Sequence, residues 1–183
     1  MIELFKNKPS PVNINFRVEP RDFMSDRVLL PLETIEALNK AAHTLKSTSK
    51  ERYEIVLTRG YIHWGRWRYF RGILAKTIFC FLYWNNKSDA KLLFSANGHD
   101  DGFSVDVQLY DVDLQTVIQF LSWRNVIMPR TTAEKFLETN KHLVSMLDRA
   151  MSTAGFIVHP DPREKLQMHY RLMSFTSTKA KGK

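Results

Sequence analysis

The stretch RGYIHWGRWRYFRGILAKTIFCFLYW, from Arg59 to Trp84, constrains the fold more than any other part of the chain. It opens with basic and aromatic residues, closes with an apolar run and is interrupted by glycines. β-Branched and aromatic residues favour strands, and glycines mark turns, so the stretch predicts two or three successive strands rather than one helix. The apolar run from Ile73 to Trp84 contains Lys76 and is shorter than the ~20 apolar residues of a membrane-spanning helix, so it predicts a core strand.

Positive charge is concentrated in the first half of the chain. The net charge is +8 over 183 residues, and residues 1–84 hold 14 lysines and arginines against 8 acids, a net charge of +6. Five aspartates and no lysine or arginine lie between Asp100 and Asp113. We therefore expect one basic and one acidic face, which suits electrostatic binding between copies; two solvated faces are the alternative.

Length and composition predict one globular domain with its own core. The apolar content of 44% and the charged content of 25% are ordinary for a soluble protein. The one cysteine, Cys80, rules out an internal disulfide, and its apolar neighbours predict a buried thiol. No signal peptide is expected, because the short apolar segment from Met1 to Phe5 is followed at once by Lys6.

The order of predicted elements indicates an α+β domain, a mainly antiparallel sheet with about three helices packed against it. The domain is expected over residues 12–175, between a flexible arm at 1–11, where Pro9 and Pro11 disfavour pairing, and a disordered basic tail at 176–183. The expected strands are 12–18, 53–57, those within 59–84, 91–95, 103–109, 156–159 and 166–175, and the expected helices are 31–46, 114–123 and 131–154, with a loop at 20–30.

Signatures of enzymes are missing from the sequence. It contains no phosphate-binding GxxxxGK[ST], no dinucleotide-binding GxGxxG, no GxSxG and no HExxH. His99, Asp100 and Asp101 are the nearest approach to a metal or acid/base site, but three adjacent side chains of an extended strand cannot face one ion, and flanking glycines favour a hairpin loop. The remaining histidines are interpreted as structural or exposed. We expect no enzyme activity, no cofactor and no metal.

Two features of the second half of the chain form a familiar pattern. The predicted strand that ends in Tyr110-Asp111 leads into a predicted helix, and a later predicted helix runs into Gly155-Phe156-Ile157-Val158 before a turn and a last strand. In this pattern the chain resembles rhabdovirus matrix proteins, most closely those of plant rhabdoviruses, in which a strand ending in Tyr-Asp leads into a helix and a later helix runs into Gly-hydrophobic-Ile-Val. The likeness covers about 60 residues, and elsewhere only the order of elements agrees. The chain lacks the lysine-rich tail and the PPxY budding motif of animal-virus members and has only Pro9-Ser10-Pro11.

The resemblance implies a structural, non-enzymatic protein that self-assembles and bridges the viral nucleocapsid to the inner leaflet of the envelope during assembly and budding. Its expected place is the virion beneath the envelope and, in the host cell, the cytoplasm and the membrane surface, with the nucleus left open. The expected partners are further copies of the chain, the nucleocapsid and an anionic membrane, with nucleic acid bound directly as an alternative.

Two sets of residues are candidates for these contacts. Cationic side chains expected to bind membrane or nucleocapsid are Lys6, Lys8, Arg59, Arg66, Arg68, Arg71 and Lys76. Self-association is expected from Ile2, Leu4 and Phe5, the apolar tip of the arm, docked in a groove of a neighbouring copy, and from Asp100 and Asp101. The competing hypothesis is a single-stranded nucleic-acid-binding protein, such as a viral silencing suppressor or movement protein, in which Trp64, Trp67, Tyr69 and Phe70 stack on bases.

Overall fold

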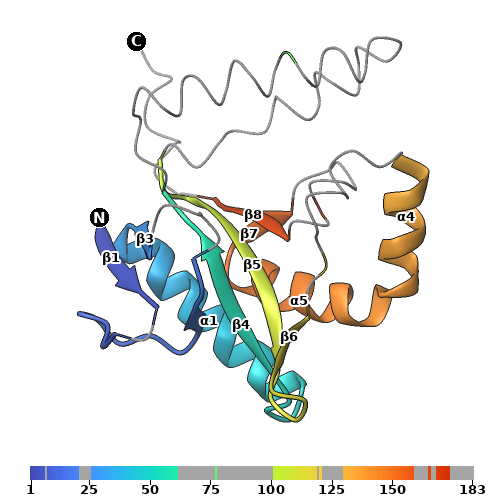
Figure 1. Ribbon diagram of the computed structural model, residues 1–183, viewed down its shortest axis with the longest axis horizontal. Coiled ribbons are helices and arrows are strands. Elements are labelled where there is room, and N and C mark those ends of the chain that lie inside the picture. The colour runs from blue at the N-terminus through green and yellow to red at the C-terminus, as the bar shows by residue number, and fades with distance from the viewer. Residues whose placement is uncertain are drawn as a thin grey trace.

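The computed structural model describes residues 1–6, 8–20, 26–61, 77, 101–118, 120, 130–158, 165 and 168–173. Figure 1 shows the arrangement of the elements. In chain order they are β1 (Ile2–Phe5), β2 (Arg17–Val18), β3 (Arg27–Leu30), α1 (Leu32–Thr48), β4 (Tyr53–Arg59), β5 (Ser104–Asp111), β6 (Thr116–Ile118), α4 (Arg130–Thr139), α5 (Lys141–Thr153), β7 (Phe156–Val158) and β8 (His169–Leu172).

The larger of the two sheets is mixed. Its strands lie in the order β2-β4-β5-β8-β7, and β6 pairs with the carboxyl-terminal end of β5. β2 runs parallel to β4, whereas the other pairs are antiparallel. The prediction of a single α+β domain is confirmed, with three named helices in the described part of the chain, but the sheet is not purely antiparallel.

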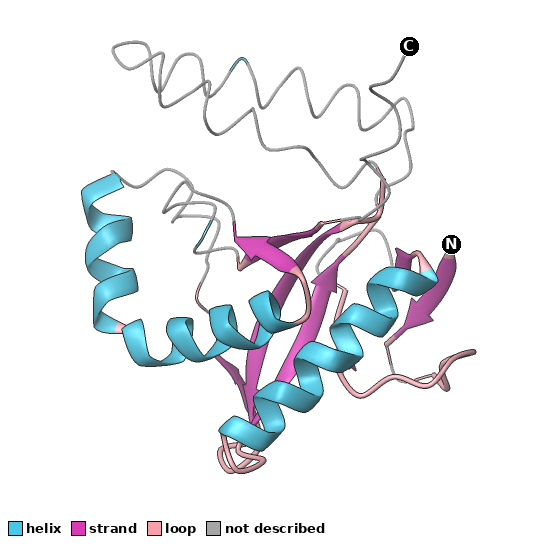
Figure 2. Cartoon of the chain, turned by 180° about the vertical axis from the view of Figure 1, so that it is seen from behind, coloured by secondary structure: helices cyan, strands magenta, loops and turns pink. Residues whose placement is uncertain are grey.

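Helices α1 and α5 cover the same face of this sheet, which is the near face in Figure 2. The alternate residues Val105, Val107 and Leu109 of β5 are fully buried and belong to one apolar cluster with residues of both helices. On α1 the predicted inward positions are confirmed, since Ile35, Leu38, Ala42 and Leu45 are all buried. The core therefore lies between the two helices and the central strands.

The opposite face of the central strands is polar and also buried. Ser104, Asp106 and Gln108 alternate with the apolar residues of β5, and their exposed fractions are 0%, 2% and 5%. Asp106 lies opposite His169 of β8, and His169 Nδ1 is 2.8 Å from a carboxylate oxygen of Asp106. Buried polar groups cost free energy unless they are paired, so this face is held together by hydrogen bonds and ion pairs rather than by apolar packing.

The predicted flexible arm at 1–11 is wrong for its first residues, and so is the predicted loop at 20–30. Ile2–Phe5 forms β1, which pairs antiparallel with β3, an unpredicted strand inside that loop. Leu4 lies opposite Val28, and both are buried. Ile2 and Leu4 in β1, and Val28 and Leu30 in β3, are apolar residues two positions apart, a spacing that matches a strand with one buried face. Neither short strand is stable without the other.

A close approach of β4 to β3 fixes the smaller sheet against the domain. A Cβ added at Gly60 would lie 2.6 Å from the Leu30 side chain and 2.7 Å from the Leu29 carbonyl oxygen. The Tyr61 amide donates a hydrogen bond of 2.8 Å to that same oxygen. Gly60 is therefore required because only a residue without a Cβ allows the two backbones to come this close.

The predicted strand at 12–18 is present only as the two residues of β2. The side chain of Asn39 on α1 accepts a hydrogen bond of 2.7 Å from the Asn15 amide and donates one of 2.9 Å to the Asn13 carbonyl. Backbone groups that would otherwise join a sheet are thus bound by a helix side chain, which explains the short strand.

The single helix predicted at 131–154 is two helices, α4 and α5, which change direction at Asn140 (Figure 2). The Asn140 side chain donates a hydrogen bond of 2.9 Å to the Phe136 carbonyl. The Asn140 amide donates to the same carbonyl at 3.1 Å, so both hydrogen bonds close the last turn of α4, and asparagine is a residue that favours helix ends over helix interiors. Four residues of the single helix are predicted to point inward: Val144, Leu147 and Met151 are buried, and Leu137 is partly buried against the core.

The helix predicted at 114–123 is wrong where the structure describes it. One carboxylate oxygen of Asp111 accepts the amides of Asp113 at 3.0 Å and Leu114 at 3.1 Å, and the chain then returns as β6 beside β5. An aspartate that precedes polar residues caps a turn as readily as a helix, so the pattern was ambiguous. Of the two features behind the resemblance, the helix after Tyr110-Asp111 is therefore absent over residues 114–118.

The second feature agrees with the structure. α5 ends before Gly155, whose φ of +92° is a conformation that favours glycine, and Phe156–Val158 then forms β7. β7 pairs with β8 as the predicted closing pair of strands. Several predictions lie outside the described residues: the strands expected at 62–84 and 91–95, the buried state of Cys80, the loop position of His99 and the disordered tail at 176–183.

Candidate interaction surface

Lys6 and Lys8 lie at the end of β1 and are both exposed. The Lys8 ammonium is 4.4 Å from the centre of the Phe5 ring and 3.9 Å from a carboxylate oxygen of Asp26. The side chains of that ion pair are 60% and 73% exposed, and such pairs contribute at most ~1 kcal/mol in water. Lys8 can therefore exchange Asp26 for another anion at little cost.

An open groove of about 770 Å³ includes Lys8 in its lining, which consists of residues 1–3, 5 and 8–11. We call it the amino-terminal groove. Its lining includes the apolar side chains of Ile2 and Phe5 and two prolines, with Lys8 as its one cation. Glu3, its one acid, is already bound to Arg27 at 2.6 Å. The groove can accept the apolar part of a ligand, with a negatively charged group of the same ligand next to Lys8.

Arg59 does not belong to this surface. Its guanidinium is 3.2 Å from Asp106, whose side chain is 2% exposed, and the Arg59 side chain is itself 26% exposed. A buried carboxylate needs a compensating cation, and Arg59 with His169 supplies it. We therefore remove Arg59 from the predicted membrane- or nucleocapsid-binding set.

The other predicted cations of that set, Arg66, Arg68, Arg71 and Lys76, lie outside the described residues, as does Asp100 of the self-association set. Asp101 is described and is already engaged. One of its oxygens accepts the Phe103 amide at 2.9 Å, and the other binds the guanidinium of Arg171. Its role is the closure of its own loop, so we do not retain it for contacts between copies.

The self-association set at the amino terminus is corrected in the same way. Leu4 is fully buried inside its own chain, and Ile2 and Phe5 are partly buried in β1. A strand that completes its own fold is not available as an arm for a neighbour. Docking of these three residues on a second copy is therefore wrong.

Sequence reasoning missed a second exposed apolar surface, the turn between β5 and β6. Leu114 is 68% exposed and Val112 is 38% exposed. We call these two residues the β5–β6 turn. Leu114 is the first residue of the helix predicted at 114–123, and its apolar character gives no signal that it is exposed.

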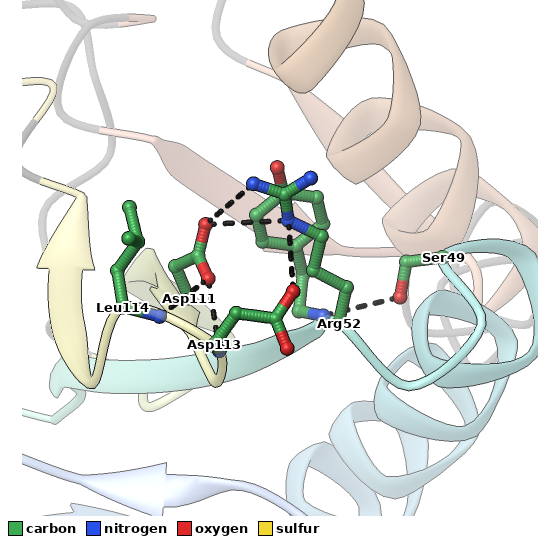
Figure 3. A network of polar contacts seen from close by, with 6 residues as sticks. Ser49, Arg52, Asp111, Asp113 and Leu114 are labelled. Atoms are coloured by element: carbon green, nitrogen blue, oxygen red, sulfur yellow. Dashed lines mark hydrogen bonds and ion pairs between the residues drawn. The ribbon is translucent and has the colours of Figure 1, made fainter.

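A polar network holds the β5–β6 turn in place (Figure 3). The second oxygen of Asp111 is 3.2 Å from the Arg52 guanidinium, which also contacts Asp113 at 3.5 Å. Burial alone would raise the pKa of Asp111, but the Leu114 amide and Arg52 outweigh it and hold the pKa below its ordinary value. The carboxylate thus stays ionised and links the turn to the segment between α1 and β4.

Neither a metal site nor a membrane span is found in the part of the chain that the structure describes. No three histidine, cysteine, aspartate or glutamate side chains there come together in a way that could hold an ion. Among those same residues, no helix has both the length and the apolar character needed to cross a bilayer. His43 and His142 are exposed on helices, as the sequence predicted, and His169 is structural.

Comparison with known proteins leaves the family open. No protein-family model matches the chain, and no curated protein sequence matches it.

Proposed function

We propose that this chain is a structural protein of the viral matrix type, which self-assembles beneath an envelope and bridges an anionic membrane surface to a nucleocapsid. The observation that carries the proposal is the exposed Lys8 in the lining of the amino-terminal groove, with the exposed Lys6 two residues before it in the chain. The net charge of +8 and the run from α5 through Gly155 into β7, one of the two features shared with rhabdovirus matrix proteins, support it. It assigns no catalytic step to the protein.

Two lysines give weak attachment by themselves. A basic residue near an anionic leaflet contributes about 1 kcal/mol, so Lys6 and Lys8 together contribute about 2 kcal/mol, or roughly 30-fold in affinity. Insertion of an apolar lipid portion into the amino-terminal groove would add to this. An assembled lattice multiplies such contacts, so a weak site in each copy is sufficient for stable binding.

A bridging protein needs two separate contact surfaces. The amino-terminal groove lies at β1, and the β5–β6 turn lies at a distant end of the molecule, as Figure 1 shows. The turn presents Leu114 on a backbone fixed by Asp111 and Arg52. We assign the groove to the membrane and the β5–β6 turn to the nucleocapsid layer.

The test is vesicle sedimentation with matched charge reversals. The variant Lys6→Glu/Lys8→Glu is compared with Lys40→Glu/Lys135→Glu, which changes two exposed lysines of α1 and α4 and alters the net charge equally. We expect the first variant to lose at least ~30-fold in affinity for phosphatidylserine-containing vesicles at low salt, and the control to bind nearly as well as the wild-type chain.

Equal losses in the two variants would contradict the assignment, because net charge alone would then explain binding. Titration of free single-stranded RNA against salt separates the competing class. Tight RNA binding with a steep salt slope and no vesicle binding would overturn the matrix proposal in favour of a nucleic-acid-binding protein.

A further inference from the structure

Strand β7 is an edge of the large sheet in the part of the chain that the structure describes. Among the described strands it is paired on one side only, with β8, and it ends the order of the large sheet. Its three residues, Phe156–Val158, include no charge, proline or glycine. Edge strands usually carry such residues, because unpaired backbone groups pair with other strands. The lack of protection in β7 is what an edge built to receive a strand requires.

Ile157, at the centre of β7, is exposed. It lies opposite Arg171 of β8, and its exposed fraction is 49%, whereas that of Phe156 is 2%. Successive residues of a strand point to opposite faces, so Phe156 packs into the core while Ile157 presents a large apolar side chain at the edge.

A hollow of about 450 Å³ lies between α5 and β7, which are neighbours in Figure 1. We call it the α5–β7 hollow. Asp148, Arg149 and Ser152 of α5 line one side, and β7 with Tyr170 lines the other. The Tyr170 hydroxyl donates a hydrogen bond of 2.7 Å to Asp148, and Lys165 is 2.7 Å from the other Asp148 oxygen. The lining of the hollow is therefore fixed before anything binds.

We propose that β7 is an interface between two copies of this chain, in which the two β7 strands pair antiparallel about a two-fold axis near Ile157. The proposal deepens the proposed self-assembly and rests on it for its biological role. Pairing in this way continues the sheet from one copy into the next and places Ile157 against Ile157 of the partner subunit. A two-fold interface uses the same surface on both copies. The edge of β7 meets this requirement, because an antiparallel pair of β7 strands centred on Ile157 presents the same residues from each copy.

Charge in the α5–β7 hollow favours a second copy over a foreign peptide. Asp148 and Arg149 are adjacent residues of opposite sign, and both line the hollow. A two-fold partner brings the same two signs, so Arg149 can approach the partner's Asp148, which has acceptor capacity beyond Tyr170 and Lys165. A uniformly basic or acidic peptide would be repelled by one of the two.

The first test is sedimentation velocity of the full chain over a range of concentrations. We expect the wild-type chain to associate, and Ile157→Lys to raise the dissociation constant at least ten-fold. Leu32→Lys is the matched control, since it makes the same change at a residue of α1 that is also 49% exposed, and it should associate like the wild-type chain. Unchanged thermal unfolding of Ile157→Lys shows that the fold is intact.

The second test is cross-linking through Ile157→Cys. Residues that face each other in an antiparallel pair have Cα atoms ~4.5–5.5 Å apart, within the range that a disulfide spans. We expect covalent dimers of Ile157→Cys under mild oxidation, but not of the wild-type chain, whose one cysteine is Cys80, or of Leu32→Cys.

Three results would overturn the proposal: a wild-type chain that stays monomeric at high concentration, association of Ile157→Lys at wild-type strength, or equal cross-linking of the two cysteine variants. Vesicle binding is scored separately in every variant. Association through β7 without any vesicle binding would refute the proposed function and leave the interface standing. Vesicle binding by a chain that stays monomeric would refute the interface and leave the membrane attachment standing.

Discussion

Replacement of Leu4 by alanine tests whether β1 completes its own fold. Leu4 is fully buried opposite Val28, while Met1, one residue before β1, is 60% exposed. Truncation of a fully buried leucine to alanine costs about 3 kcal/mol, because the transfer free energy of the removed carbons is lost and a cavity remains. Met1→Ala, a truncation at an exposed position of the same segment, should change the free energy of unfolding by less than ~0.5 kcal/mol.

Urea denaturation measures the difference directly. With a slope of about 2 kcal/mol per molar urea, a loss of 3 kcal/mol lowers the midpoint by about 1.5 M. The size of the shift should not depend on protein concentration, since Leu4 packs within its own chain. A strand exchanged between copies would instead make the midpoint fall on dilution.

The opposite result would refute the reasoning clearly. If Leu4→Ala and Met1→Ala both leave the midpoint unchanged at every concentration, β1 does not pack on the domain. If the loss in Leu4→Ala grows on dilution, the arm docks on a neighbour, as the sequence pattern had indicated.

Three further outcomes follow from particular contacts. Gly60→Ala should destabilise the fold by about 1–3 kcal/mol in the same urea assay, because its Cβ would meet the Leu29 carbonyl at 2.7 Å. Tyr170→Phe should lower the free energy of unfolding by about 1 kcal/mol at neutral pH, because the hydrogen bond to Asp148 is lost. Burial, and then Asp148, raise the pKa of Tyr170 above its ordinary 10.0, so the wild-type chain should lose stability as pH rises above 10. Thermal unfolding over this pH range should show a smaller loss for the variant. Burial alone would raise the pKa of Glu54, but hydrogen bonds from Lys46 and Arg17 hold it below 4.5. The ionised Glu54 therefore stabilises the fold fully above pH 4.5, and this stabilisation is lost as pH falls further. In acid unfolding followed by circular dichroism, Glu54→Gln should make the stability depend less on pH.

Much of the fold could be predicted because it depends on local periodicity. The inward stripe of α1 follows from spacing alone and is confirmed. The alternation along β5 correctly places Val105, Val107 and Leu109 in the core, although the polar face of the strand is buried as well. β1 and β3 could not be predicted in this way. Each is only four residues long, and their pairing joins residues more than 20 positions apart, which a local pattern does not encode.

The charged surface was harder to predict, because sequence gives the number of charges and not their partners. Arg59 appeared to be one of a row of surface cations, yet the buried carboxylate of Asp106, 47 residues away, binds it. Asp101 appeared to be part of an acidic face, but Arg171 of β8 binds it. In both cases the partner comes from a strand that is distant in sequence and adjacent in the sheet.

Ion pairs of this kind hide individual cations but do not change the net charge of +8. In the described residues, the lysines and arginines that have an exposed side chain and no acidic partner are Lys6, Lys40, Lys50, Lys135 and Arg149. Lys40, Lys135 and Arg149 lie on α1, α4 and α5, whereas Lys6 follows β1 and Lys50 follows α1. If net charge alone held the protein on an anionic layer, reversal of any two would weaken binding equally. The amino-terminal groove predicts unequal losses, since Lys8 lines an apolar groove that an anionic lipid can enter and Lys6 is close to it in the chain, whereas Lys40 and Lys135 lie on α1 and α4.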